Sequence, residues 1–123
     1  VFDRLFERFP NLRIASVENG GEFLGDLLRV LGKTKDRVHG YFRNDPADTF
    51  RNHVWINPFW EDDIGLVIEQ MGADRVILGS AWPHMEGLAQ PRDLLDELGG
   101  VADDDLTKIL FDNTAALNER QPT

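Results

Sequence analysis

The hydrophobic positions of the chain follow two patterns, short continuous apolar runs and longer stretches with helical spacing. The apolar runs predict buried strands at residues 12–17 (LRIASV), 53–57 (HVWIN) and 74–79 (DRVILG). Apolar residues three or four apart predict helices that begin near residues 2, 23, 61, 94 and 103, the second of them ending near Gly32. Pro46 suits a first helical position and predicts a short helical turn before the second strand.

Strands that alternate with helices indicate right-handed crossovers and a parallel sheet, so the predicted fold class is α/β. We treat residues 1–123 as a single segment, because no linker is long enough to divide them. Three strand–helix units leave two sheet edges open, whereas a closed barrel needs eight strands. The first helix also begins without an N-cap residue. We therefore expect a missing segment or another chain to cover the edges.

Composition narrows the possible partners. Hydrophobic residues make up 41% and charged residues 28% of the chain, which is typical of a globular protein. A formal charge of −9 repels phosphate backbones and anionic lipids, so we expect no nucleic-acid or membrane partner. The chain has no cysteine, which excludes thiolate metal sites and disulfides. No signal-peptide pattern is found either, and together these features favour a cytoplasmic location.

The loops that follow the three strands are the places where parallel α/β folds keep their functional groups. Glu18 follows the first strand and could act as a general base or ligate a metal; alternatively it bonds the N–H groups of the Gly20–Gly21 turn. His84 follows the third strand and has the chemistry of a general acid or base; alternatively it bonds neighbouring backbone. We therefore predict Glu18 and His84 as the catalytic candidates.

The same loops hold the candidate substrate-binding residues, which are Asn19, Phe59, Trp82 and Glu86. The acidic runs at residues 61–63 and 103–105 stand at helix starts, so helix capping is the better interpretation of them than cation binding. His53 begins the second strand, at the end opposite the expected site, and is not predicted to be catalytic.

Four motifs in order resemble the C-terminal part of the amidohydrolase-related family, the branch that includes aminocarboxymuconate-semialdehyde decarboxylase and resorcylate-type decarboxylases. They are residues 9–14 (FPNLRI), 18–21 (ENGG), 74–87 (DRVILGSAWPHMEG) and 108–113 (KILFDN). The resemblance implies a partial (β/α)8 TIM barrel in which the predicted strands are the sixth, seventh and eighth. It also implies a divalent metal, usually zinc, at the carboxyl ends of the strands.

One position departs from the family pattern. The eighth strand of the family ends in Ser-Asp-aromatic-Pro-His, in which the Asp is a metal ligand or proton carrier, and this chain has Ala81 in that place. A methyl group cannot bind a cation or carry a proton. The family's early histidine ligands would precede Val1, and Glu18 stands near the place of another family histidine. We therefore expect no metal ligand at Ala81 and no zinc bound by this chain alone.

Two classes of function follow from the resemblance. In the first, the chain is the C-terminal segment of a metal-dependent hydrolase or non-oxidative decarboxylase of a small organic substrate, and is inactive alone. In the second, it is a non-catalytic half-barrel that folds as a homo-oligomer, which buries the open edges. A third possibility is that Ala81 is an engineered or cloning-derived change in an excised fragment.

Overall fold

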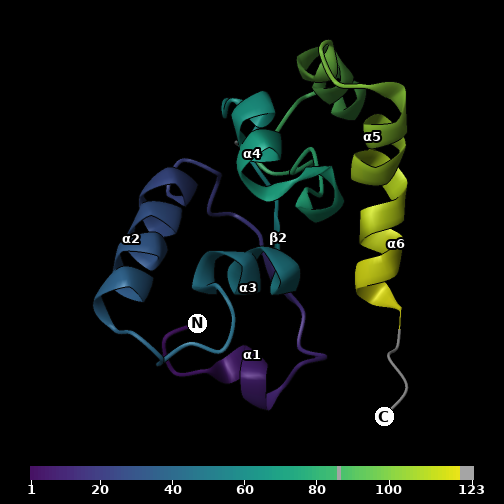
Figure 1. Cartoon of the computed structure of the whole chain (residues 1–123). Helices are drawn as coiled ribbons and strands as arrows, with labels where there is room; N and C mark the ends of the chain where they lie inside the picture. Colours follow the sequence, from purple (N-terminus) through teal and green to yellow (C-terminus); the bar gives the residue numbers. More distant parts are fainter. Residues whose placement is uncertain (86, 120–123) are drawn as a thin grey trace.

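A computed structural model of the chain describes residues 1–85 and 87–119 (Figure 1). Its α-helices and strands are, in chain order, α1 (Leu5–Arg8), β1 (Ile14–Ser16), α2 (Leu24–Arg37), α3 (Pro46–His53), β2 (Val54–Ile56), α4 (Ile64–Met71), α5 (Asp103–Thr107) and α6 (Asn113–Asn118). Two 3-10 segments, η1 (Ala73–Arg75) and η2 (Pro91–Leu98), and a π-helical segment, η3 (Lys108–Asp112), complete the order.

The two strands are parallel, as predicted, with Ile14 opposite Val54. The third predicted strand, residues 74–79, is not confirmed as a strand, because it forms a single parallel bridge between Val76 and Ile56. Part of this segment is already helical in η1. The carbonyl groups of Ala73 and Val76 each accept a hydrogen bond of 2.7 Å from the side chain of Asn113 on α6. Asn113 thus ties this segment to the C-terminal helix, while Pro58, which has no N–H, cannot extend the ladder from β2.

The helices begin where their polar residues cap them. Asp45 precedes α3, and one of its carboxylate oxygens accepts from the N–H of Ala47 at 2.8 Å. Asp63 precedes α4 and accepts from the N–H of Leu66 at 2.9 Å, which confirms the predicted cap there. Helix α3 reaches His53 and is longer than the predicted turn.

Two helix predictions are wrong in detail. Helix α2 does not end near Gly32 but continues to Arg37, since a single interior glycine costs only about 1 kcal/mol and the following polar residues face solvent. The run Asp103–Asp105 does not cap the last helix through a side chain: Ala102 is the N-cap residue, and the three carboxylates lie in the first turn. They still suit the positive end of the helix dipole.

The core lies between α2 and α3 on one side of β2 and the C-terminal helix, α5 to α6, on the other (Figure 1). Its buried members come from the first four helices, β2, the bridged segment and η3: Phe6, Leu24, Leu31, Phe50, Val54, Ile56, Val67, Met71, Val76 and Ile109. No helix within the described residues has the length and apolarity required to cross a membrane.

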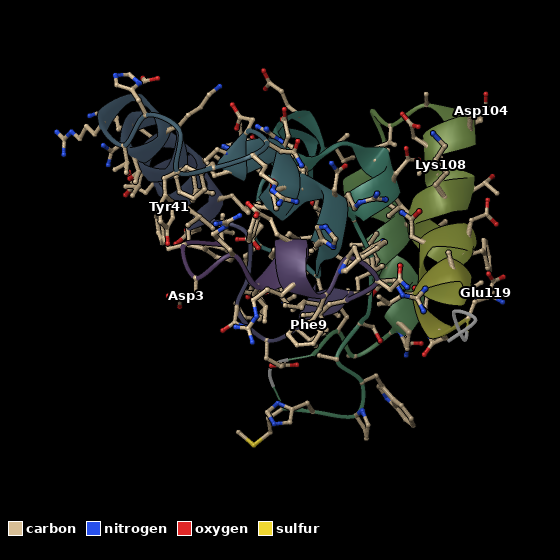
Figure 2. All side chains as sticks on the ribbon, turned by 60° about the horizontal axis from the view of Figure 1, so that its bottom comes forward. Asp3, Phe9, Tyr41, Asp104, Lys108 and Glu119 are labelled. Atoms are coloured by element: carbon tan, nitrogen blue, oxygen red, sulfur yellow. The ribbon has the colours of Figure 1, made fainter. Side chains whose placement is uncertain are left out.

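Lys108 ties the C-terminal helix to η1 on the outside of the fold (Figure 2). Its ammonium group lies 3.1 Å from a carboxylate oxygen of Asp105 and 3.2 Å from one of Asp74. Hydrogen bonds to these two carboxylates raise the pKa of Lys108. The ion pair between Lys108 and Asp74 joins the C-terminal helix to η1, and the side chain of Asn113 joins the same helix to η1. The C-terminal helix therefore holds the bridged segment in place.

Candidate functional site

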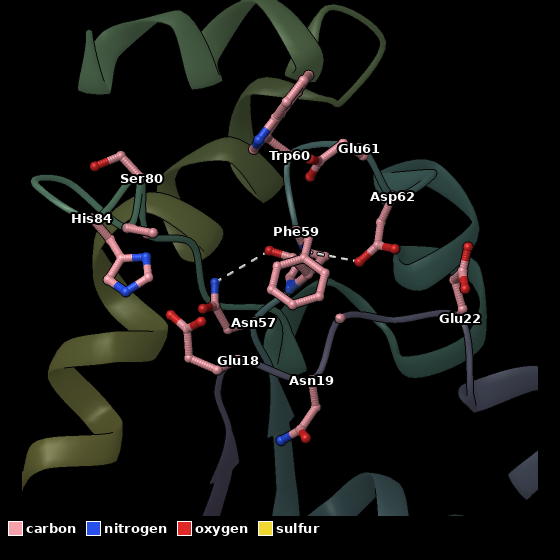
Figure 3. A pocket seen from close by; sticks show the side chains of 14 residues that line it. Glu18, Asn19, Glu22, Asn57, Phe59, Trp60, Glu61, Asp62, Ser80 and His84 are labelled. Atoms are coloured by element: carbon pink, nitrogen blue, oxygen red, sulfur yellow. Dashed lines mark hydrogen bonds between the residues drawn. The ribbon is translucent and has the colours of Figure 1, made fainter. Parts of the chain in front are cut away.

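A hollow of about 420 Å³ opens where the two strands and the bridged segment end (Figure 3). All three predicted loops contribute to it. The lining residues are Glu18, Asn19, Gly20, Glu22, Asn57, Pro58, Phe59, Trp60, Glu61, Asp62, Gly79, Ser80, Ala81 and His84. Four of the six residues predicted for the site are therefore brought together: Glu18, Asn19, Phe59 and His84.

The first loop carries Glu18 in an unusual backbone conformation. Its φ is +61°, in the left-handed region that costs a residue with a side chain roughly 1 kcal/mol or more. The side chain is exposed and lies on the hollow. The N–H of Gly21 donates to Asp62 at 2.8 Å, so this member of the glycine turn is bonded by Asp62 and not by Glu18. Asn19 turns back on β1, donating to the carbonyl of Val17 at 3.0 Å.

The second loop begins with Asn57, which the strand-end rule includes in this loop but which is not among the predicted site residues. Its backbone N–H donates to the carbonyl of Ser16 at 2.9 Å, and its side-chain amide donates to the carbonyl of Ile77 at 3.3 Å. Asn57 thus connects the ends of β1, β2 and the bridged segment. A polar residue directly after a buried strand is the signal that could have identified it. Phe59 and Trp60 follow and form the apolar wall of the hollow.

The third loop turns sharply after Gly79. Ala81 has a φ of +55°, and its carbonyl accepts from the N–H of His84 at 2.8 Å. A Cβ atom on Gly87 would lie 2.7 Å from the carbonyl oxygens of Ser80 and Ala81, so only glycine fits there without a shift of the backbone. This turn places His84 on the hollow.

The other two predicted residues of this loop do not join the lining. Trp82 is 62% exposed and is absent from the described residues that line the hollow, where Trp60 supplies the indole instead. The turn at Ala81 directs the chain outward before Trp82, which the sequence pattern does not reveal. Glu86 lies outside the described residues.

Glu18, Asn57 and His84 face the same part of the hollow, and the ring of Phe59 stands beside them (Figure 3). A carboxylate and an imidazole beside one cavity can remove a proton from one atom of a ligand and deliver a proton to another. Aromatic rings on the adjoining wall favour a ligand with a flat apolar part. The arrangement is suited to acid–base chemistry on a small organic molecule.

The residues of the hollow do not fit a catalytic metal. Within the described part of the chain, no group of three or more His, Asp or Glu side chains is placed to hold an ion. Catalytic zinc sites use three protein ligands, and the methyl group of Ala81 supplies none. The remaining donors near it are Glu18 and His84, which are too few. No step of a reaction is therefore assigned to a metal held by these residues.

The sequence profile of the amidohydrolase family matches residues 1–117. The structure resembles that of an amidohydrolase from Mycobacterium avium subsp. paratuberculosis K-10, with a TM-score of 0.89 and 40% sequence identity over 93% of this chain.

Two decarboxylases share the fold at lower identity. One is a dihydroxybenzoic acid decarboxylase from Polaromonas sp. JS666, solved with bound manganese and the inhibitor 2-nitroresorcinol, at a TM-score of 0.66 and 19% identity over 91% of this chain. The other is a 2,6-dihydroxybenzoate decarboxylase in complex with 2,6-dihydroxybenzoate, with the same TM-score, identity and coverage. The chain spans 30% of the Mycobacterium protein and 35% and 36% of the two decarboxylases.

Proposed function

Since this chain belongs to the amidohydrolase family, we propose that it forms the last three β/α units of a (β/α)8 barrel and that its hollow binds a small carboxylated organic molecule. The observation that carries the proposal is the convergence of Glu18, Asn57 and His84 on one hollow at the carboxyl ends of the strands. In closed parallel barrels this is the end that holds the active site.

Two reactions suit these groups. In hydrolysis, Glu18 accepts a proton from the attacking water, and His84 donates one to the leaving group as the C–N or C–O bond breaks. In non-oxidative decarboxylation, the C–C bond to the carboxylate breaks, CO2 leaves, and the electron pair that stays on carbon takes a proton from His84. Phe59 and Trp60 hold the flat part of the substrate in either reaction.

The proposal for the chain alone is narrower than that for a complete barrel. The Polaromonas decarboxylase carries manganese, and the family resemblance implies a divalent metal, but the donors of this hollow are too few to hold one. The chain alone is therefore proposed to bind the substrate without turning it over. The lack of an acidic side chain at Ala81 also favours a second function, a non-catalytic half-barrel that folds as a homo-oligomer and binds a ligand without turnover.

Binding can be tested with 2,6-dihydroxybenzoate as the probe, followed by amide NMR of the chain. We expect the probe to shift the amide resonances of Glu18, Phe59 and His84. Glu18→Gln and His84→Ala should each raise the Kd of the probe by about tenfold, because each variant loses roughly one charge-assisted hydrogen bond. His39→Ala is the matched control, since His39 is an exposed histidine away from the hollow. Shifts confined to other surfaces would contradict the proposal.

The replacement of the family's acidic ligand by Ala81 has its own test. The native chain with added manganese is expected neither to bind stoichiometric metal nor to release CO2 from 2,6-dihydroxybenzoate, because Ala81 offers no ligand. Ala81→Asp restores a carboxylate at that position and should bind manganese more tightly than the native chain. Stoichiometric metal and turnover in the native chain would show that the interpretation of Ala81 is wrong.

A further inference from the structure

Asp62 joins two loops of the hollow that lie far apart in the sequence. Its Oδ2 atom accepts a hydrogen bond from the N–H of Gly21 at 2.8 Å and another from the N–H of Phe59 at 2.7 Å. Gly21 belongs to the loop after β1 and Phe59 to the loop after β2, and the bond within the second loop is drawn in Figure 3. Hydrogen bonds to an ionised carboxylate are stronger than neutral ones, so one oxygen holds both loops.

The two loops are closely packed around Asp62. A Cβ atom on Gly20 would lie 2.8 Å from the ring of Phe59 and 3.1 Å from Oδ2 of Asp62. A Cβ atom on Gly21 would lie 2.5 Å from a methyl group of Val67 on α4. The two glycines therefore let the first loop approach closely enough for the carboxylate to reach it.

Asp62 differs from its neighbour Asp63, although the two stand side by side in one acidic run. Asp63 bonds only within its own helix start, to Leu66, which is ordinary helix capping. Asp62 makes no bond of that kind among the described residues; its side-chain bonds go to amides of the two loops that contribute to the hollow. Since the two side chains have the same charge and adjacent positions, Asp63 provides a matched control.

We propose that Asp62 is a positioning residue that fixes the Glu18 loop against the Phe59 loop and so sets the width of the hollow. The inference rests on the proposed function, because the hollow is taken to be the substrate site. Without Asp62 the carboxylate of Glu18 and the aromatic wall lose their common anchor. The ligand should then bind more weakly, while the core cluster, which does not include Asp62, keeps the chain folded.

The test is amide hydrogen exchange of the 123-residue chain, which needs no ligand. In Asp62→Ala, the protection factors of Gly21 and Phe59 should fall together by about tenfold or more, the amount expected for a lost charge-assisted bond. Asp62→Asn keeps an acceptor oxygen and should restore part of the protection at both amides. Asp63→Ala should lower protection at Leu66 and leave Gly21 and Phe59 unchanged.

The outcomes separate this inference from the proposed function. Independent changes at Gly21 and Phe59, or the same loss in Asp63→Ala, would overturn the role of Asp62. If Asp62→Ala does not fold, Asp62→Asn decides, since unchanged protection at both amides in that variant would also overturn the role of Asp62.

The Kd for 2,6-dihydroxybenzoate should rise in Asp62→Ala. An unchanged Kd despite lost protection would refute the positioning role. Coupled protection in a chain that binds no probe would support the coupling and refute the proposed function.

Discussion

The two ends of the small parallel sheet each present a histidine, and the two are held in opposite ways. At the amino end, the ring of His53 stacks on Phe6 with centroids 4.4 Å apart, and its Nδ1 lies 2.9 Å from the carbonyl oxygen of Leu12. At the carboxyl end, His84 is exposed on a loop, beside Glu18 and Ala81, whose backbones are left-handed. Both residues are histidines, so residue type does not distinguish their roles. The direction of the strands does, because His53 lies at the amino end of the sheet and His84 at its carboxyl end.

The difference between the two histidines distinguishes the end of the sheet that contributes to stability from the end that carries reactive groups. The amino end satisfies its polar groups and packs its rings, so its residues contribute mainly to the free energy of unfolding. The carboxyl end leaves ionisable groups facing a hollow and holds two strained backbone positions, as functional sites often do. Substitutions at the two ends should therefore have different effects on stability and on binding.

The largest expected effect is on packing at the amino end. Phe6 is only 5% exposed, so Phe6→Ala should lower the free energy of unfolding by about 3 kcal/mol, the usual cost of removing a buried ring. Phe59 at the carboxyl end is 44% exposed, and Phe59→Ala should cost less than about 1 kcal/mol. Urea denaturation of both variants measures the contrast. Equal losses would abolish the distinction between the two ends.

The two histidines themselves give the next contrast. His53→Ala removes a ring stack and a hydrogen bond, and should destabilise the chain by about 1–2 kcal/mol. His84→Ala should change stability by less than about 0.5 kcal/mol, because the side chain is exposed. Thermal unfolding of the pair checks the stability side. A stability loss in His84→Ala as large as that in His53→Ala would contradict the comparison.

Backbone strain at the carboxyl end predicts a gain of stability. Glu18→Gly relieves a left-handed backbone and should stabilise the chain by about 0.5–1 kcal/mol, while it removes the carboxylate and weakens probe binding. Asn19→Gly is the control, since Asn19 does not have a left-handed backbone and glycine there should only lower stability. Denaturant midpoints of the two variants should move in opposite directions; movement in the same direction would argue against strain at Glu18.

The smallest effect concerns the helix that leads into the amino end. Asp45 begins α3, and the hydrogen bond from Lys35, 2.6 Å away, together with backbone N–H groups, holds the pKa of Asp45 below its ordinary value of 3.8, against the opposing effect of partial burial. Its stabilisation is therefore complete above about pH 4 and is lost as the pH falls through the lowered pKa.

Asp45→Asn keeps the helix cap and loses the charge, so at neutral pH it should cost less than about 1 kcal/mol. Between pH 7 and pH 3, unfolding measurements should show a smaller loss of stability in Asp45→Asn than in the native chain. Parallel pH profiles would mean that the Lys35 pair contributes nothing to folding.

Much of the fold could be predicted because its determinants are local. The apolar runs identified β1 and β2, helical spacing identified α2 and α4, and the acidic residue before Ile64 identified a cap. The third strand is not confirmed, because a strand needs partners elsewhere in the chain: Val76 forms a single bridge to Ile56, and its carbonyl group bonds the side chain of Asn113, 37 residues away. Local sequence carries no record of that bond.

The sequence predicted the location of the site better than the residues that line it. The rule that function collects at carboxyl strand ends selected the loops of Glu18, Phe59 and His84, which do line one hollow. It missed Asp62, because an acidic residue before a helix has the same pattern whether it caps that helix or bonds a distant loop. It also chose Trp82 over Trp60, since both are tryptophans in strand-end loops.

Residue types in order were enough to predict the alternation of strands and helices, the family, and the lack of an acidic side chain at Ala81. Which side chains meet depends instead on long-range contacts. Asn113 reaches across to the bridged segment, Asp62 joins two loops, and the turn at Ala81 sends Trp82 outward. These are contacts between residues far apart in the chain, or consequences of one backbone angle, and a local pattern of polar and apolar residues specifies neither.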